Sequence, residues 1–231
     1  IDDNDLDHMK LSIINRANLF IDNSLLALDR LGHFGGNLIQ NGQVIMMHSF
    51  SRSLMACFAS AYKSGKSFEV ICTDSQPTKE SRWAIEQFSY WGIKVFFVID
   101  AGMAMIMPKA DWCIAGADSI SVTGDVVNKI GTYQMALLSK VFGKSFYVAS
   151  EIIKIQTKTL EGYPIHLERR PADEILDYQQ LDQAVDNIDV VHQFFDLTPA
   201  SYIQGLITEH GMIAPSRISD VWNTFILNFD K

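Results

Sequence analysis

Polar side chains that could hold or activate a small molecule follow five apolar runs of the sequence. The runs are VIMMH, FEVICTD, KVFFVID, WCIAGAD and SFYVAS. The polar residues at or just after their ends are His48, Ser49, Ser51, Arg52, Thr73, Asp74, Ser75, Gln76, Asp100, Asp118, Glu151 and Lys154. Such hydroxyl, carboxylate and cationic groups can bind a phosphorylated ligand or move protons on a bound sugar. Any one of them is also explained by the change from buried strand to loop.

Three roles are open to Ser49, which lies in the stretch HSFSRS at residues 48–53. It could react, bind a phosphate group, or cap the helix that the next run, LMACFASAYKSG, predicts. A serine hydroxyl acts as a base or nucleophile only when a neighbouring group activates it. His48 is adjacent, but adjacent residues of a strand point to opposite faces of the sheet. The sequence therefore does not favour activation of Ser49 by His48.

A second candidate site lies in GADSISVTGDVVNKIGTYQMALLSKVFG, residues 116–143. Gly116 permits close approach of the backbone to a ligand, and Asp118 follows it. Asn128 and Lys129 are predicted to open a helix, whose free N–H groups would form an anion site with the lysine ammonium. A capped helix with a solvated lysine explains the same residues equally well.

Asp196 is predicted to end a strand within FFDLTPASYIQGLITEHG. Thr198 and Pro199 favour a helix start, because Thr caps helices and Pro suits the first helical position. A structural role for this stretch is favoured, although Asp196 could still face the same pocket.

The elements that must position these residues alternate along the chain. Helix-like segments near 52–64, 79–91, 102–107 and 129–142 separate the apolar runs. Continuous apolar strands separated by helices are typical of a parallel sheet covered on both faces. The carboxyl ends of such strands meet at one edge, outside which ligands bind. Residues 156–189 are more polar and are predicted to form an excursion over the sheet edge.

Residues 5–40 have apolar positions at spacings of three and four, which predicts a helix. Gly32, Gly35 and Gly36 interrupt it and predict either a break or a close contact. The chain begins with IDDNDLDH and without Met, so we expect a start within a longer protein.

Composition narrows the class of partner. The chain has 231 residues, a formal net charge of −8 and a pI near 5.1. The sequence has no long basic run, so direct binding to nucleic acid is not expected. It also has no apolar run long enough to predict a membrane span. Cys57, Cys72 and Cys113 lie in apolar runs without metal-ligand spacing, which predicts reduced thiols in a cytoplasmic protein without a metal or cofactor.

Three runs, GADSISVTGDVVNKIGTYQMALL, YVASEIIKI and FFDLTPASYIQGLITEHGMIAP, resemble one known family. It joins the alpha, beta and delta regulatory subunits of initiation factor 2B, with their archaeal relatives, to ribose-1,5-bisphosphate isomerase and methylthioribose-1-phosphate isomerase. The resemblance covers about residues 11–220. It implies an α/β fold: a Rossmann-like parallel sheet with helices on both faces, preceded by the end of an N-terminal helical domain. Residues 1–41 would belong to the helical domain, and residues 42–231 would form the ligand-binding and dimerisation domain.

The family's isomerases imply a chemistry for two positions. Their catalytic cysteine matches Ser49, and their catalytic aspartate matches Asp118. The aspartate would act as general acid on the sugar oxygens during aldose-to-ketose conversion. This chain keeps the aspartate and lacks the thiol, whose pKa of about 8.5 lies far below that of a serine hydroxyl.

The remaining matches concern phosphate. Ser51, Arg52 and Ser53 match a phosphate-binding turn, and Asn128 and Lys129 match contacts at a helix start. Lys154 matches a lysine of the pocket. Further phosphate contacts of the family precede residue 1.

HSFSR and TDSQP resemble the alpha-type and archaeal initiation-factor branch, whereas GAD and the run IINRANLFIDNSLLALDRLGHFG resemble the isomerases. The leading hypothesis is a regulatory subunit homologue that binds a sugar phosphate or nucleotide monophosphate in a former isomerase pocket. It would form a homodimer and could join other initiation-factor-2B-like subunits. The alternative is an isomerase of the ribose-1,5-bisphosphate type, so the sequence leaves open whether the protein is an enzyme. A structural partner without a ligand is a third, weaker hypothesis.

Overall fold

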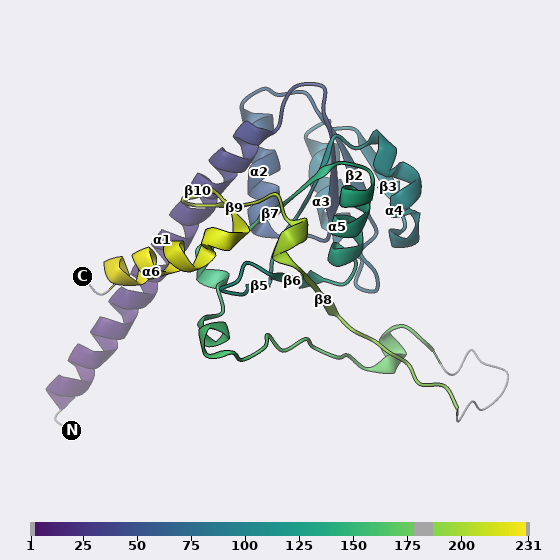
Figure 1. Ribbon diagram of the computed structural model, residues 1–231. Helices are drawn as coiled ribbons and strands as arrows, with labels where there is room; N and C mark the ends of the chain where they lie inside the picture. The colour runs from purple at the N-terminus through teal and green to yellow at the C-terminus, as the bar shows by residue number, and fades with distance from the viewer. Residues whose placement is uncertain (1–2, 178–186, 230–231) are drawn as a thin grey trace.

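The computed structural model describes residues 3–177 and 187–229, and its centre is a seven-stranded sheet (Figure 1). The strand order is β10-β9-β7-β4-β1-β2-β3, and all neighbours are parallel except β9 and β10. The strands are β1 (Val44–His48), β2 (Glu69–Thr73), β3 (Val95–Val98), β4 (Trp112–Ala115), β7 (Ser145–Ala149), β9 (Gly205–Thr208) and β10 (Gly211–Ile213). The predicted α/β class and the five apolar runs as strands are confirmed.

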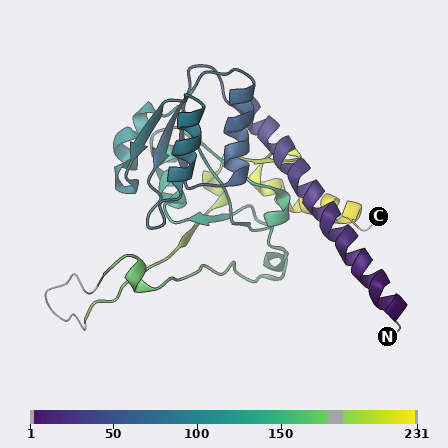
Figure 2. The same ribbon diagram turned by 180° about the vertical axis from the view of Figure 1, so that it is seen from behind.

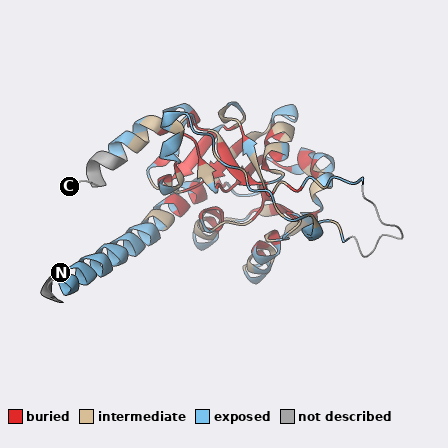
Figure 3. Cartoon of the chain, turned by 90° about the horizontal axis from the view of Figure 1, so that it is seen from below, coloured by how far each residue is buried: buried red, intermediate tan, exposed pale blue. Residues whose placement is uncertain are grey.

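Both faces of this sheet are covered, and alternate residues of one strand show it. Ile45 and Met47 of β1 pack in a core with α1 (Asp3–Leu38), α2 (Arg52–Lys63) and α3 (Ser81–Tyr90). Met46 packs in a second core with α4 (Met103–Ile106), α5 (Thr132–Val141) and α6 (Ile218–Phe229). Residues 44–47 of the strand are therefore all apolar, because neither of its faces meets water. Figure 3 shows the buried sheet between partly exposed helices.

The glycines of α1 make a close contact and do not break the helix. An added Cβ at Gly32 would lie 2.8 Å from the Ala56 carbonyl oxygen, and one at Gly35 would lie 2.7 Å from the Cys57 Cβ. Glycine thus lets α1 and α2 approach closely. The amino-terminal part of α1 projects away from the body, and its residues from Leu6 onward are exposed (Figures 1 and 3).

A smaller antiparallel sheet lies at the carboxyl edge of the large one (Figure 1). It consists of β5 (Ser119–Ile120), β6 (Val126–Lys129) and β8 (Phe195–Thr198) in the order β5-β6-β8. Asn128 and Lys129 therefore end a strand, and the prediction that they open a helix is wrong. Their pairing with Asp196 and Phe195, more than 60 residues away, overrides the local helix signal.

Single 3₁₀ turns connect several elements. Thr198 and Pro199 lead into one of these turns, so the predicted helix start there is wrong. The strand pair β9–β10 follows. The turns are η1 (Asp100–Gly102), η2 (Met107–Lys109), η3 (Ile152–Lys154), η4 (Thr157–Glu161), η5 (Ala172–Glu174), η7 (Ala200–Tyr202) and η8 (Pro215–Arg217).

The polar excursion leaves the body after η4 and returns into β8 (Figures 1 and 2). Its described outgoing and returning parts lie side by side, with Arg169 paired to Gln193. Among the described residues, none of the helices has the length and apolar character to cross a membrane.

Candidate functional site

The turn after β1 is fixed by hydrogen bonds to its neighbours at the carboxyl edge. Ser49 has a φ of +65°, a left-handed conformation that is uncommon for serine and marks functional turns. Its backbone N–H donates to the Ser75 hydroxyl at 2.8 Å. The Ser75 hydroxyl also bonds that of Ser81 at 2.6 Å, and the Ser75 N–H donates to Asp100 at 2.9 Å. The ends of β1, β2 and β3 thus form one connected edge.

The side chain of Ser49 points to a carboxylate that sequence analysis did not identify. Its hydroxyl donates to Glu80 at 2.9 Å. The same Glu80 oxygen lies 3.2 Å from the Lys129 ammonium, and the Thr78 hydroxyl donates to the other oxygen. Partial burial disfavours the Glu80 carboxylate. The bonds from Thr78 and Ser49 and the Lys129 charge outweigh it and lower the pKa of Glu80 below its ordinary value.

Lys129 is 5% exposed at the end of β6, and its ammonium has several close neighbours. Besides Glu80, they include the Thr78 hydroxyl at 3.2 Å and the ring of Phe194, with its centroid at 3.1 Å. Burial lowers the pKa of Lys129, while the charges of Glu80 and Asp118 act in the opposite direction. The positive charge of Lys129 is therefore already paired with a carboxylate of the protein, that of Glu80.

His48 does not contact the Ser49 hydroxyl. One ring nitrogen bonds the Thr73 hydroxyl at 2.7 Å, and the other donates to the Ile130 carbonyl at 2.8 Å. Burial lowers the pKa of His48, against an opposing effect of Asp100 at 3.8 Å. The ring links β1, β2 and the end of β6, and both of its nitrogens are engaged.

Asp118 follows β4 on the open side of this edge, where its side chain is exposed. Partial desolvation by the surrounding protein raises the pKa of Asp118, and the charges of Lys154 and Lys129 oppose that rise. The Lys154 ammonium donates to the Ala117 carbonyl at 2.7 Å, which places it beside the GAD backbone. Lys129 and Lys154 therefore both lie within electrostatic range of Asp118.

Gly116 keeps space between two of the predicted phosphate contacts. An added Cβ would lie 2.6 Å from the Ser51 hydroxyl oxygen and 3.9 Å from the Asn128 side-chain oxygen. Ser51, and not Ser49, caps α2, and its hydroxyl accepts from the Leu54 N–H at 3.1 Å. The Asn128 amide donates to the Thr132 hydroxyl at 2.9 Å, so it contacts the first residue of α5.

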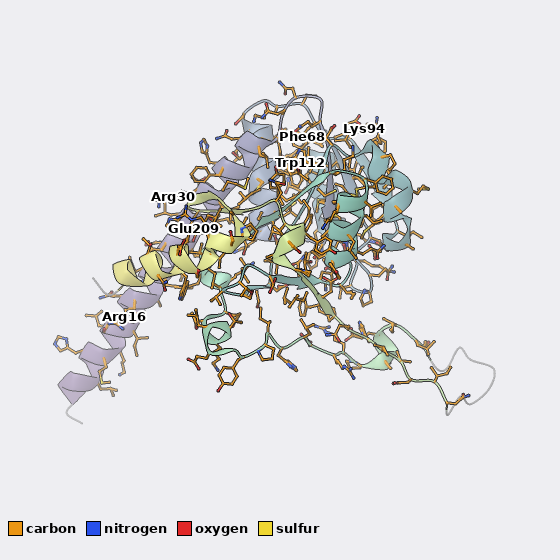
Figure 4. The ribbon with its side chains drawn as sticks, viewed as in Figure 1. Arg16, Arg30, Phe68, Lys94, Trp112 and Glu209 are labelled. Atoms are coloured by element: carbon orange, nitrogen blue, oxygen red, sulfur yellow. The ribbon has the colours of Figure 1, made fainter. Side chains whose placement is uncertain are left out.

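Two residues of the predicted phosphate turn face elsewhere. Arg52 is exposed and lines a hollow with Phe50 and Trp83, on the face covered by α1, α2 and α3. The Ser53 hydroxyl donates to Glu151. Glu151 in turn lines a cavity of about 210 Å³ between α1 and the sheet edge, together with Arg30 and Glu209. Figure 4 shows Arg30 and Glu209 close to each other there.

Asp196 caps the helix that follows Lys129. Its carboxylate accepts from the Gly131 N–H at 2.7 Å and from the Tyr133 N–H at 3.1 Å. Burial raises the pKa of Asp196 to about 6, against the effect of these two bonds. The structural role that the sequence favoured for this residue agrees with the geometry. Within residues 3–177 and 187–229, no cluster of three His, Cys, Asp or Glu side chains has a geometry that could hold a metal ion.

Comparison with known proteins finds relatives of two kinds. A sequence model of the initiation factor 2 subunit family matches residues 2–215. A protein named ribose 1,5-bisphosphate isomerase, from Thermococcus kodakarensis, is 36% identical over 217 residues, which are 94% of this chain and 67% of that protein. The translation initiation factor eIF2B subunit alpha of Dictyostelium discoideum is 30% identical over 223 residues, 93% of this chain and 68% of that protein.

Solved structures show the same two kinds. The translation initiation factor eIF-2B of Pyrococcus horikoshii superposes with a TM-score of 0.75 at 32% identity, over 88% of this chain and 70% of that chain. The 5-methylthioribose 1-phosphate isomerase of the same organism gives a TM-score of 0.78 at 26% identity, over 96% of this chain and 65% of that chain. The chain thus spans about two thirds of the length of these relatives.

Proposed function

This chain belongs to the initiation factor 2 subunit family, and from that premise we propose that it is a regulatory, initiation-factor-2B-like homologue. It binds a small phosphorylated ligand, a sugar phosphate or a nucleoside monophosphate, at the carboxyl edge of its sheet. The family itself follows from the match over residues 2–215 and confirms the resemblance of the sequence motifs. The relatives carry names of both kinds, so the choice between them rests on the site.

The Ser49 hydroxyl carries this proposal. It donates to Glu80, whose carboxylate is itself paired with Lys129 and hydrogen-bonded by Thr78. A carboxylate with a lowered pKa is a weak base, and His48 is engaged elsewhere. Of the two titratable neighbours, neither Glu80 nor His48 is suited to take the proton of Ser49, which an alkoxide nucleophile would require. Ser49 is therefore suited to holding a ligand in place.

Binding would rest on Lys154 and Lys129, on the start of α2 at Ser51, and on Asn128. Asp118 and Glu80 balance the two lysine charges, so the edge can accept the hydroxyl groups of a sugar as well as one phosphate group. We propose that residues 42–231 form the domain that binds this ligand. Residues 1–41 would be the end of an N-terminal helical domain. A cytoplasmic location accompanies this assignment.

Asp118 favours a second candidate function, an aldose-phosphate isomerase. Its raised pKa increases the protonated fraction that a general acid requires. Several relatives named ribose 1,5-bisphosphate isomerase are also 34–36% identical to this chain over the aligned residues. In that case the reaction would proceed without the thiol.

Proton NMR of the full-length protein with ribose 1,5-bisphosphate, ribose 5-phosphate and AMP tests the two functions. The regulatory function predicts saturable broadening of ligand resonances without conversion. Formation of a ketose that disappears in Asp118→Asn would establish the isomerase instead. Absence of both broadening and conversion would refute a ligand-binding function altogether.

A further inference from the structure

Glu80 occupies an unusual place for a site expected to hold phosphate. Its side chain is 12% exposed and lies between the Ser49 hydroxyl and the Lys129 ammonium. A phosphate group that bound Lys129 would lie next to this carboxylate. Both carboxylate oxygens already accept hydrogen bonds or an ion pair from the protein. Glu80 is thus held in place from three directions and cannot turn away without breaking those contacts.

Among Asp118 and the charged groups that act on it, the positive and negative charges are equal in number. The groups that act electrostatically on Asp118 are two lysines, Lys154 and Lys129, and one further carboxylate, Glu80. With Asp118 itself, two positive charges face two negative ones. Lys154 donates to a neutral carbonyl, that of Ala117, and forms no ion pair among the described residues, whereas Lys129 is paired. One cation of this set is therefore available for a phosphate group, and the other is not.

A carboxylate in this position suits hydroxyl groups. Carboxylates accept hydrogen bonds from ribose hydroxyls in other α/β folds, at the carboxyl edge of the sheet. They repel a phosphate group at the same distance, because like charges brought together in a partly buried site are strongly unfavourable. The Lys154 side of the edge and the Glu80 side therefore differ in the chemical group that each can accept.

We propose that Glu80 determines ligand specificity: it admits hydroxyl groups on the Ser49–Lys129 side and excludes a second phosphate group. This inference rests on the proposed function and specifies its ligand class. The pocket takes a phosphomonoester that carries free hydroxyl groups, such as a sugar monophosphate or a nucleoside monophosphate, and discriminates against a sugar bisphosphate. The phosphate group lies on the Lys154 side, and the hydroxyl groups lie on the Glu80 side.

Calorimetric titration of the full-length protein with ribose 5-phosphate and with ribose 1,5-bisphosphate tests this assignment. The wild-type protein should bind ribose 5-phosphate at least about tenfold more tightly than ribose 1,5-bisphosphate. Glu80→Gln should strengthen binding of the bisphosphate by about tenfold or more, because it removes the negative charge and releases Lys129. The affinity for ribose 5-phosphate should rise by less than that for the bisphosphate, because its single phosphate group lies on the Lys154 side and an amide still forms hydrogen bonds with hydroxyl groups.

Two further variants separate charge from structure. Glu80→Asp keeps the charge with a shorter side chain, and it should keep the preference for the monophosphate. Glu69→Gln is the matched control, because Glu69 pairs with Lys94 at 2.9 Å at the opposite, amino-terminal edge of the sheet. Figure 4 places Lys94 at that far edge. The control should bind both ligands as the wild type does.

The outcomes are distinct. Equal wild-type affinity for both ligands, or an equal gain for both in Glu80→Gln, would overturn the inference and leave the proposed function intact. A loss of the preference in Glu80→Asp would show that shape and not charge discriminates, and would also overturn it. Failure of the wild type to bind either ligand would overturn the proposed function and this inference together.

Discussion

At the scale of single residues, Lys129 and Glu80 are best understood as one unit. The lysine is buried, and its charge is tolerated because a carboxylate, a hydroxyl group and an aromatic ring surround it. Breaking a buried pair by removing one partner leaves the other charge uncompensated. The two residues should consequently be coupled in any measurement of ligand affinity.

Lys129→Ala should weaken binding of ribose 5-phosphate by about 1–3 kcal/mol, since it removes one positive charge and exposes the ligand to an unpaired Glu80. Titration calorimetry measures the change. The double variant Lys129→Ala/Glu80→Gln should recover part of the loss, because the two positions share one interaction. Lys94→Ala is the control at the far edge of the sheet. Unchanged affinity in Lys129→Ala would remove the lysine from the site.

Sequence reasoning brought most of these residues together but missed Glu80. Asp118 and Lys154 follow apolar runs, and the rule that parallel strands end at one edge is enough to group them. Lys129 was identified separately, as part of an anion site at a predicted helix start. Glu80 lies at a helix start, where an acidic residue needs no special explanation. Its role depends on contacts with Ser49 and Lys129, residues 31 and 49 positions away, and no local pattern contains them.

At the scale of elements, β8 supplies the residue that caps α5, Asp196. The Asp196 carboxylate accepts hydrogen bonds from the first turn of that helix, yet its surroundings favour the protonated form. The folded pKa of about 6 lies above the unfolded value of 3.8. The folded protein therefore binds a proton that the unfolded chain releases between these values, and stability falls as pH rises from about 4 to about 6.

Asp196→Asn should remove this pH dependence, because asparagine stays neutral and its carbonyl oxygen can still accept from Gly131 and Tyr133. Relative to the variant, the wild type should lose on the order of 1–3 kcal/mol of unfolding free energy as the pH rises from 4 to 7. Urea unfolding at a series of pH values measures it. A constant difference between the two proteins across that range would contradict the assignment to Asp196.

The contact of α1 with α2 depends on glycine. Gly35→Ala should destabilise the protein by about 1–3 kcal/mol, since the new methyl group would collide with Cys57 and force the helices apart. Thermal or urea unfolding would show the loss. Asp22→Ala, at an exposed position of the same helix, should have little effect. A stabilised Gly35→Ala would mean that helix propensity matters more than the contact.

The element predictions succeeded where a pattern was local. Apolar runs such as VIMMH and SFYVAS became strands of the large sheet, and the segments between them became helices. The failures, at Asn128–Lys129 and Thr198–Pro199, both involve the small antiparallel sheet. Its strands β6 and β8 pair across the long excursion, so the deciding hydrogen bonds are remote in sequence.

At the scale of the whole molecule, we expect the full-length protein to be a homodimer, as the family resemblance implies. Sedimentation equilibrium at micromolar concentration tests this directly. A single species of monomer mass across the concentration range would contradict it. A species larger than a dimer would instead indicate the wider assembly that some initiation-factor-2B-like subunits are expected to form.

Two cations lie against the ring of Phe194. The Lys129 ammonium is 3.1 Å from the ring centroid, and the Arg170 guanidinium is 3.9 Å from it. Arg170 belongs to the excursion and is held there by Glu168 and Glu174. One aromatic side chain thus joins the excursion to the lysine of the candidate site. Coupling between two sites is reciprocal. A macromolecule that bound the excursion and shifted this ring would change the affinity of the candidate site for its ligand. Ligand binding would then change the affinity for that macromolecule by the same factor.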